Sequence, residues 1–244
     1  MAKTRKDLDQ AAGTLARRMY HTVLPIIGAD ERGRHDAIGS GILIAFGTRR
    51  FLATAAHVLE HNDENGSTNP LWKATTLYLG NPGNPHVRLL GDAPKATDPA
   101  DVALVELGDE TLAGLENCHF LNADHDFAAA STSSNFAVAI GYQNRASKPN
   151  EDLKTVKHEP LIFSNSGSHR KGIHIYLPMD WTKVRDGDLI RSIGKLNGIS
   201  GGGLFWLRTL TDPESFDPLA GIIIEHANKT LKATDVHLLR HLIA

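Results

Sequence analysis

Three short segments, which supply a histidine, an aspartate and a serine in that order, constrain this chain most. They are Thr54-Ala55-Ala56-His57, Asp101-Val102-Ala103-Leu104 and Gly198-Ile199-Ser200-Gly201-Gly202. Acyl transfer needs a hydroxyl nucleophile, an imidazole that takes and returns its proton, and a carboxylate that orients the imidazole. Gaps of 44 and 99 residues separate the three side chains. Such gaps suit two successive small β-barrels that meet at a shared site.

Short β-type runs separated by turn residues favour an all-β chain. The runs are 23–27, 41–46, 50–54, 75–80, 86–90 and 102–107 in the first half, and 136–141, 160–164, 173–178, 203–207 and 220–225 in the second. Residues 46–49 are typical of a tight hairpin turn. We expect antiparallel strands throughout, with residues 118–126 crossing between the halves.

Helices are expected at both ends of the chain, and a short one is expected after the strand that leads to His57. Apolar residues at helical spacing predict an amphipathic helix over 6–20. Thr234 is predicted to be the N-cap of a closing helix. The apolar face of that helix would carry Leu238, Leu239, Leu242 and Ile243.

Composition and charge give no support to two classes of partner, nucleic acids and membranes. The 244 residues are 41% hydrophobic, enough to bury about 70 to 75% of the unfolded surface. Lys and Arg number 26 against 28 Asp and Glu, so no broad basic field favours nucleic acid or anionic lipid. The apolar run 219–224 is far shorter than the roughly 18 residues of a membrane helix. We therefore expect neither a nucleic-acid nor a membrane partner.

The start of the chain and its cysteine content indicate a cytoplasmic protein. Residues 1–7 are charged and lead into a polar helix rather than an apolar stretch with a cleavage site, unlike a secretory signal. Cys118 is the single cysteine, so an internal disulfide is excluded and a reducing compartment is favoured. No glycine turn accompanies Cys118, which we expect to be structural.

By the three segments, and by Gly39-Ser40-Gly41 with the hairpin after it, the chain resembles the chymotrypsin-like (trypsin-like) serine peptidases, in particular their compact, cysteine-poor bacterial members. The order His, Asp, Ser belongs to that type. The resemblance extends over residues 23–226. It implies an all-β fold of two antiparallel six-stranded β-barrels. The implied division is a helical extension at 1–20, a first barrel at 21–120 and a second barrel with the closing helix at 121–244.

The resemblance also implies an activity and the residues that perform it. The chain would be a serine endopeptidase that hydrolyses a polypeptide substrate through an acyl-enzyme. Ser200 would be the nucleophile, His57 the general base and then acid, and Asp101 the group that orients His57. The backbone N–H groups of Gly198 and Ser200 would form the oxyanion hole. No metal and no organic cofactor is implied.

Two departures from the family pattern concern the loop around the serine. Ile199 stands where digestive peptidases have an aspartate that captures a freshly cleaved N-terminus, so we expect a chain that is competent without N-terminal clipping. Gly203 replaces the usual proline after the glycine pair, which would loosen the loop.

The remaining departures concern the substrate-binding wall. Gly194, six residues before the serine, would line the base of the primary pocket, which argues against a charged floor. Ile224, Glu225 and His226 align with the wall that pairs with the substrate backbone. Ile224 replaces a serine that braces the catalytic carboxylate in many relatives. His226 replaces a glycine and would narrow the pocket for a small or acidic side chain.

Each motif has an alternative interpretation. His57-Val58-Leu59-Glu60-His61 matches an inverted zinc-peptidase pattern, although residues 62–66 would break the helix which that pattern needs. Residues 198–202 match the nucleophile elbow of α/β-hydrolases, but only 44 residues remain for the acid and histidine that must follow. Asp98 is the alternative carboxylate.

Two alternatives to a constitutive peptidase use the same scaffold. One is a peptide-binding or regulatory module with weak catalysis, because glycine-rich loops and an unbraced Asp101 would leave the site unformed. The other is an enzyme that stays inactive until an activating protein partner docks, for example on the 6–20 helix. Activity would separate these alternatives.

Overall fold

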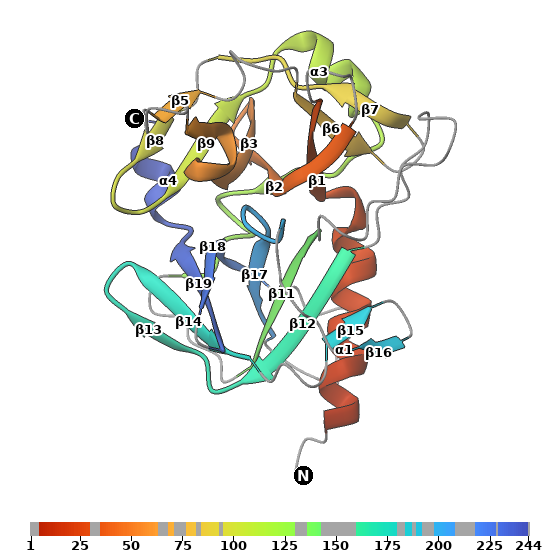
Figure 1. The fold of residues 1–244 in the computed structure, drawn as a ribbon, viewed down its shortest axis with the longest axis vertical. Coiled ribbons are helices and arrows are strands. Elements are labelled where there is room, and N and C mark those ends of the chain that lie inside the picture. Colours follow the sequence, from red (N-terminus) through yellow and green to blue (C-terminus); the bar gives the residue numbers. More distant parts are fainter. Residues whose placement is uncertain are drawn as a thin grey trace.

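Strands make up most of the structure and lie in two sheets, one above the other in Figure 1. The computed structural model describes residues 5–29, 35–62, 68–70, 77–81, 84–92, 95–129, 136–142, 160–179, 184–186, 189–191, 198–207, 218–227 and 229–243. The first sheet contains β1 (Val23–Ala29), β2 (His35–Phe46), β3 (Arg49–Ala55), β6 (Leu77–Asn81), β7 (Asn84–Arg88), β8 (Lys95–Thr97), β9 (Val102–Glu106) and β10 (Leu121–Asn122). A separate hairpin pairs β4 (Glu60–Asn62) with β5 (Thr68–Pro70).

The first sheet closes on itself through the segment 84–97. Its strands run in the order β7-β6-β1-β2-β3-β9-β8, and β10 pairs with β2. β7 pairs with β6, while β8, a few residues later, pairs with β9. Between them, Gly91 forms a bridge with Leu107, and Gly108 N–H donates to the Leu90 carbonyl at 2.9 Å. One stretch of chain thus joins the two ends of the sheet.

The second sheet has the order β13-β14-β19-β18-β17-β11-β12-β15-β16. Its strands are β11 (Phe136–Tyr142), β12 (Pro160–Ser166), β13 (His169–Lys171), β14 (His174–Pro178), β15 (Val184–Asp186), β16 (Leu189–Arg191), β17 (Gly203–Trp206), β18 (Leu219–Ala227) and β19 (Thr230–Asp235). Asn165 Nδ2 on β12 donates to the Pro178 carbonyl on β14 at 2.7 Å. This side-chain bond links β12 to β14, two strands that no ladder of the described sheet joins directly.

Both sheets share one six-strand topology. The main strands of the first half are, along the chain, β1, β2, β3, β6, β7 with β8 counted as one, and β9; those of the second half are β11, β12, β14, β17, β18 and β19. In each half they pair in the cycle first, second, third, sixth, fifth, fourth and back to the first. In the second half, the bond between Asn165 and Pro178 stands in place of a ladder between β12 and β14. The all-β, two-barrel fold predicted from sequence is confirmed. The additional strands of the described chain lie at sheet edges, form the separate hairpin β4–β5, or cross between the halves as β10 does.

Helical segments lie near the two ends of the chain and also within its first half. They are α1 (Arg5–Arg18) with the 3₁₀ turn η1 (Met19–His21), the 3₁₀ turn η2 (Ala56–Leu59), α3 (Asp109–Gly114) and α4 (Leu238–His241). In Figure 1, α1 runs beside β12, and α4 lies by the upper barrel near β9. None of the helices within the described ranges has the length and apolar character that crossing a membrane requires.

The buried apolar residues extend across the seam between the two barrels. Strand residues alternate between the two faces of a sheet. On β17, Leu204 and Trp206 face the interior of the second barrel, while Phe205 joins the larger core of the first barrel. On β18, Ile223 likewise faces inward and Ile222 faces the seam. Because both faces are buried, these strands are continuous apolar runs in the sequence.

The closing helix begins later than predicted, and Thr234 is not its N-cap. Thr234 lies inside β19, and α4 begins at Leu238 with no side-chain cap. The strand continues to Asp235 because Thr234 pairs with Ile222 of β18 and with His174 of β14. The apolar face of the predicted helix does pack against the core, with Leu239 fully buried. The division at 1–20, 21–120 and 121–244 stays a prediction, since pairing within a sheet does not show that either half folds alone.

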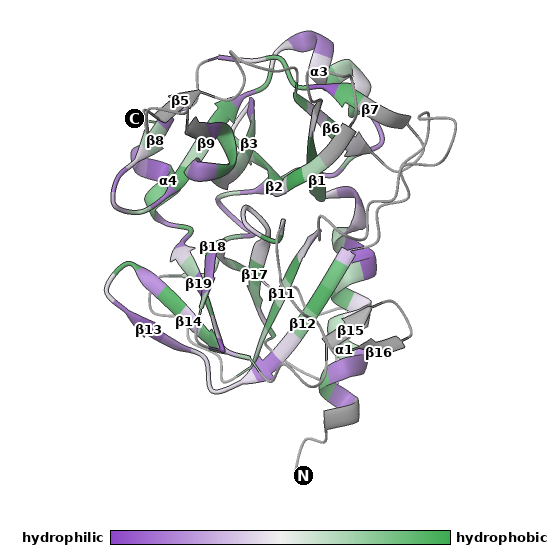
Figure 2. Ribbon diagram, viewed as in Figure 1, coloured by the Kyte–Doolittle hydropathy of each residue, from purple (hydrophilic) through white to green (hydrophobic). Residues whose placement is uncertain are grey.

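The N-terminal helix α1 buries its apolar face and therefore contributes to stability. Leu8, Leu15 and Met19 are at most 4% exposed, and hydrophilic and hydrophobic residues alternate along α1 in Figure 2. We predict that Leu15→Ala lowers the free energy of unfolding by about 2 to 4 kcal/mol, because a cavity forms under the helix. Arg17→Ala, at an exposed position of the same helix, should change it by less than about 0.5 kcal/mol. Urea denaturation of both variants measures this, and equal effects would contradict the packing described.

Candidate active site

His57 lies on the turn that follows β3 and points out of the core. Ala56, Val58 and Leu59 of η2 are buried, whereas the His57 side chain is 48% exposed. A tight 3₁₀ turn with apolar residues on three of its four positions leaves the fourth facing outward. The imidazole is thus held on a rigid element next to the seam.

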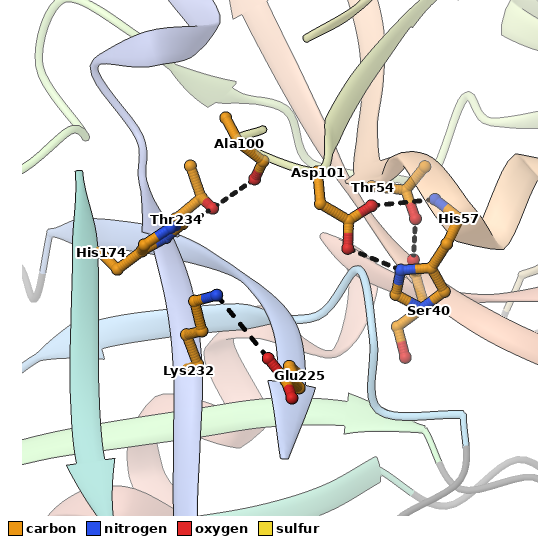
Figure 3. A network of polar contacts seen from close by, with 9 residues as sticks. All are labelled: Ser40, Thr54, His57, Ala100, Asp101, His174, Glu225, Lys232 and Thr234. Atoms are coloured by element: carbon orange, nitrogen blue, oxygen red, sulfur yellow. Dashed lines mark hydrogen bonds and ion pairs between the residues drawn. The ribbon is translucent and has the colours of Figure 1, made fainter. Parts of the chain in front are cut away.

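Asp101 holds His57 through two hydrogen bonds. His57 Nδ1 lies 2.7 Å from Asp101 Oδ2, and the His57 backbone N–H donates to Asp101 Oδ1 at 3.0 Å (Figure 3). An ionised carboxylate only accepts hydrogen bonds, so Nδ1 carries the proton and Nε2 is left as the basic nitrogen. Asp101 itself adopts a positive φ of 52°, which a residue with a Cβ rarely does. The surrounding contacts must therefore hold this turn in place.

The acidic surroundings of His57 raise its pKa above the ordinary value of 6.5. The hydrogen bond to Asp101 is the main cause, and the charges of Asp101, Glu60 and Glu225 add to it, while burial opposes them. Glu60 directly follows the turn η2 of the first half, and Glu225 lies on β18 of the second barrel. The imidazole therefore faces carboxylates from both barrels, and each of them stabilises the imidazolium ion.

The loop that carries Ser200 has a fixed glycine-dependent shape. Gly198 and Gly201 have φ values of 96° and 85°, which residues with a Cβ seldom adopt. Gly201 N–H donates to the Ile223 carbonyl at 2.7 Å, and Gly202 N–H donates to the Ile199 carbonyl at 3.0 Å. Ile199 is fully buried, which anchors the middle of the loop.

Two backbone N–H groups of this loop remain available for a ligand. In the described part of the chain, neither Gly198 N–H nor Ser200 N–H donates to a protein acceptor. Ser200 itself is partly exposed. Two free N–H donors from the loop that carries a hydroxyl nucleophile are what a developing oxyanion requires.

Ser40 of β2 connects the serine loop to the first barrel. Its N–H donates to the Ser200 carbonyl at 2.8 Å, and its hydroxyl donates to the Gly198 carbonyl at 2.9 Å. A Cβ on Gly201 would contact the Ser40 carbonyl and Thr54 Oγ1, and Thr54 lies three residues before His57. The loop therefore packs directly against the strand ends that lead to His57.

The candidate triad is joined on one side only. His57 and Asp101 are hydrogen bonded, whereas the described contacts include no hydrogen bond between Ser200 and His57. Such bonds are often long in free enzymes and shorten in the substrate complex. Asp98, the alternative carboxylate, is exposed and makes no described contact with His57.

A hydroxyl from the second barrel supports the Asp101 turn. Ile224, which stands where the family resemblance expects a bracing serine, is buried and apolar. Thr234 Oγ1 on β19 instead donates to the carbonyl of Ala100, the residue before Asp101, at 2.5 Å (Figure 3). Sequence patterns gave neither Ser40 nor Thr234 a role in the site. Gly39-Ser40-Gly41 was a signal, but the sequence marked Thr234 only as a helix cap.

The expected substrate wall is partly described. β17 pairs with β18 only as far as Ile222, so the described strands leave Ile224 and Glu225 without a ladder partner on that edge. The Glu225 side chain is 55% exposed, and Lys232 Nζ lies 3.6 Å from its Oε2. Burial lowers the pKa of the adjacent His226. Gly194, predicted at the base of the pocket, lies outside the described residues.

The zinc-peptidase interpretation of His57 and His61 is wrong. That pattern needs both imidazoles on one helix, but the 3₁₀ turn ends at Leu59 and the strand β4 begins at Glu60. The described residues contain no group of His, Cys, Asp and Glu side chains arranged to hold a metal ion. The α/β-hydrolase elbow does not form either, since β17, a strand rather than a helix, follows the serine loop.

Comparisons with known proteins give structural likenesses only. No protein-family model matches the chain, and no curated protein matches it. Among solved structures, a human pathogenic astrovirus serine protease is 10% identical, with a TM-score of 0.44 over 89% of this chain and 90% of that chain. A chain from a structure described for the Sesbania mosaic virus VPg protein is 13% identical, with a TM-score of 0.49 over 90% of each chain. With scores this low, neither likeness bears on the site, which rests on this chain's own contacts.

The raised pKa of His57 can be measured directly. Nuclear magnetic resonance titration should place His57 above 6.5, and His174 and His226 below it, because burial lowers the pKa of these two. The folded state binds the His57 proton more tightly than the unfolded chain does. This pair thus stabilises the fold below about pH 6.5, and the contribution is lost as the pH rises through the raised pKa. Asp101→Asn should lower the pKa of His57. In the unaltered protein, a pKa of His57 at or below that of His226 would contradict the pairing with Asp101.

A pair of glycine variants tests the fixed shape of the serine loop. A Cβ on Gly47, at φ 58°, has no neighbour within 4 Å. We expect Gly47→Ala to cost about 1 kcal/mol from backbone strain alone. Gly201→Ala adds a collision with the Ser40 carbonyl and with Thr54, and should cost at least about 2 kcal/mol more. If Gly47→Ala and Gly201→Ala lowered the free energy of unfolding equally, the serine loop would not have the fixed shape described.

Proposed function

We propose that the chain is a serine endopeptidase that acts through Ser200, His57 and Asp101. The observation that carries the proposal is the double hydrogen bond from His57 to Asp101, which fixes the imidazole with Nε2 as its basic nitrogen. The neighbouring serine loop, with its two unused N–H donors, supports it. No metal or organic cofactor takes part in the proposed reaction.

The proposed reaction proceeds in two acyl-transfer steps. Ser200 Oγ attacks the carbonyl carbon of the scissile peptide bond, while His57 Nε2 takes the hydroxyl proton. The N–H groups of Gly198 and Ser200 stabilise the oxyanion, and His57 returns the proton to the departing amine. Water then attacks the acyl-enzyme with the same proton transfers, which releases the acid and restores the serine.

The proposed substrate is a polypeptide that adds a strand to the open edge of β18. Extended peptides bind in this way through main-chain hydrogen bonds, and side-chain pockets supply specificity. Ile224 and Glu225 lie on the edge that β17 leaves uncovered. His226 beside them would narrow the primary pocket for a small or acidic side chain, and Gly194 would leave the base of that pocket uncharged. The lowered pKa of His226 leaves its imidazole neutral at pH 7.

A catalytically weak or partner-gated module is the second candidate. It is favoured by the absence of a described hydrogen bond between Ser200 and His57. An activating protein partner on α1 would have to bind the polar face of that helix, because the apolar face is already buried. A cytoplasmic location fits either candidate and is part of the proposal.

A fluorophosphonate probe, which reacts with activated serines, tests the proposal on the purified protein. We expect labelling that Ser200→Ala and His57→Ala abolish, with peptide turnover reduced about a millionfold if the triad acts as a unit. Ser166→Ala and His119→Ala change the same residue types at exposed positions and should label normally. Labelling that persists without Ser200 would contradict the peptidase. Labelling only after cell extract is added would favour the partner-gated candidate.

A further inference from the structure

Two buried hydroxyls cross the seam between the barrels in opposite directions. Ser40 reaches from the first barrel to the serine loop, and Thr234 reaches from the second barrel to the Asp101 turn. Both side chains are fully buried. We infer that Ser40 and Thr234 are positioning residues that hold the nucleophile loop and the His57–Asp101 pair in register. The inference rests on the proposed peptidase function.

The hydroxyl, the N–H and the carbonyl of Ser40 are all hydrogen bonded, either to the serine loop or to residues next to it. Its hydroxyl donates to the Gly198 carbonyl and accepts from the Tyr142 N–H on β11, at 2.9 and 2.8 Å. Its N–H donates to the Ser200 carbonyl, and its carbonyl accepts from Thr54 Oγ1 at 2.7 Å. One residue of β2 thus holds the 198–199 and 200–201 peptide units. The unit that carries the Ser200 N–H lies between these two, and the unit that carries the Gly198 N–H lies next to the first, so Ser40 limits the directions of both donors.

Thr234 performs the reciprocal task for the acid. The Asp101 turn is held from within the first barrel by Asp101 N–H to the Thr97 carbonyl at 3.0 Å and by Ala56 N–H to the Asp101 carbonyl at 3.1 Å. Among the described residues, the bond from Thr234 to the Ala100 carbonyl is the one that reaches this turn from the second barrel. It therefore fixes Asp101 relative to the sheet on which Ser200 is carried.

The proton arrangement around Thr234 has one solution. A hydroxyl has a single proton, and the bond to the Ala100 carbonyl uses it. His174 Nδ1, 3.3 Å from Thr234 Oγ1, must then donate rather than accept. Burial, followed by the charge of Lys232, lowers the pKa of His174, so the ring is neutral at pH 7 with its proton on Nδ1. His174 thereby orients the Thr234 hydroxyl toward Ala100.

Removal of either hydroxyl should have a distinct effect on the site. Thr234→Val keeps the shape of the side chain but loses its hydrogen bond. The freed Asp101 turn should lower the pKa of His57 by about half a unit or more and slow fluorophosphonate labelling at least about tenfold. Thr234→Ser should restore both values. Ser40→Ala should slow labelling at least about tenfold and speed amide hydrogen exchange over 198–202, but leave the pKa of His57 unchanged.

Thr111→Val is the matched control. Thr111 is a fully buried threonine whose hydroxyl bonds to the Arg88 carbonyl and the Leu90 N–H at 2.8 Å, on α3 at the outer end of the first barrel (Figure 1). Its loss should lower the melting temperature in the same way as the other changes. Labelling and the pKa of His57 should stay as in the unaltered protein.

Two results would overturn the inference. One is a pKa of His57 that stays the same in Thr234→Val, or in Thr234→Ala should the valine variant not fold. The other is normal hydrogen exchange over 198–202 in Ser40→Ala. Neither readout depends on catalysis. If the unaltered protein does not react with the probe, the peptidase proposal fails, while these two measurements still decide whether Ser40 and Thr234 position the site.

Discussion

The contact of Ser40 with the serine loop is the constraint on which the rest of the site depends. His57 and Asp101 lie at strand ends of the first barrel, whereas Ser200 lies on a loop of the second. The hydrogen bonds from Ser40 to the carbonyls of Gly198 and Ser200 join the two sets. A buried hydroxyl that lost its partners would be left unsatisfied, at a cost of about 1 to 3 kcal/mol. The seam is therefore strongly biased toward one register.

Packing makes that register rigid. β11, β17 and β18 place alternate side chains in the second barrel and in the core that continues into the first. Phe205 and Ile222 are fully buried at this junction. A relative movement of the two sheets would expose these side chains and break the bond from Thr234 to Ala100. The burial of both faces of these strands and the hydrogen bonds of Ser40 and Thr234 thus stabilise the same boundary between the two barrels.

The pairing of His57 with Asp101 could be predicted from local patterns, but the supports of the site could not. His57 and Asp101 stand out because small and apolar neighbours surround each of them, and the structure brings the two together. Ser40 lies in a Gly-Ser-Gly segment that signals a tight approach without naming its partner. Thr234 resembled a helix cap because local sequence cannot show that β14 and β18 both pair with its strand. Long-range pairing decided that residue's role, and a pattern over neighbouring residues carries no information about it.

A crystal structure of the protein after reaction with a small fluorophosphonate tests the central claim most directly. We predict a covalent bond from phosphorus to Ser200 Oγ, with one phosphonyl oxygen accepting from the N–H groups of Gly198 and Ser200. The His57 ring, still bonded to Asp101, should lie within hydrogen-bonding distance of the adduct. An unmodified Ser200, or an adduct whose oxygen points away from the two N–H groups, would contradict the account.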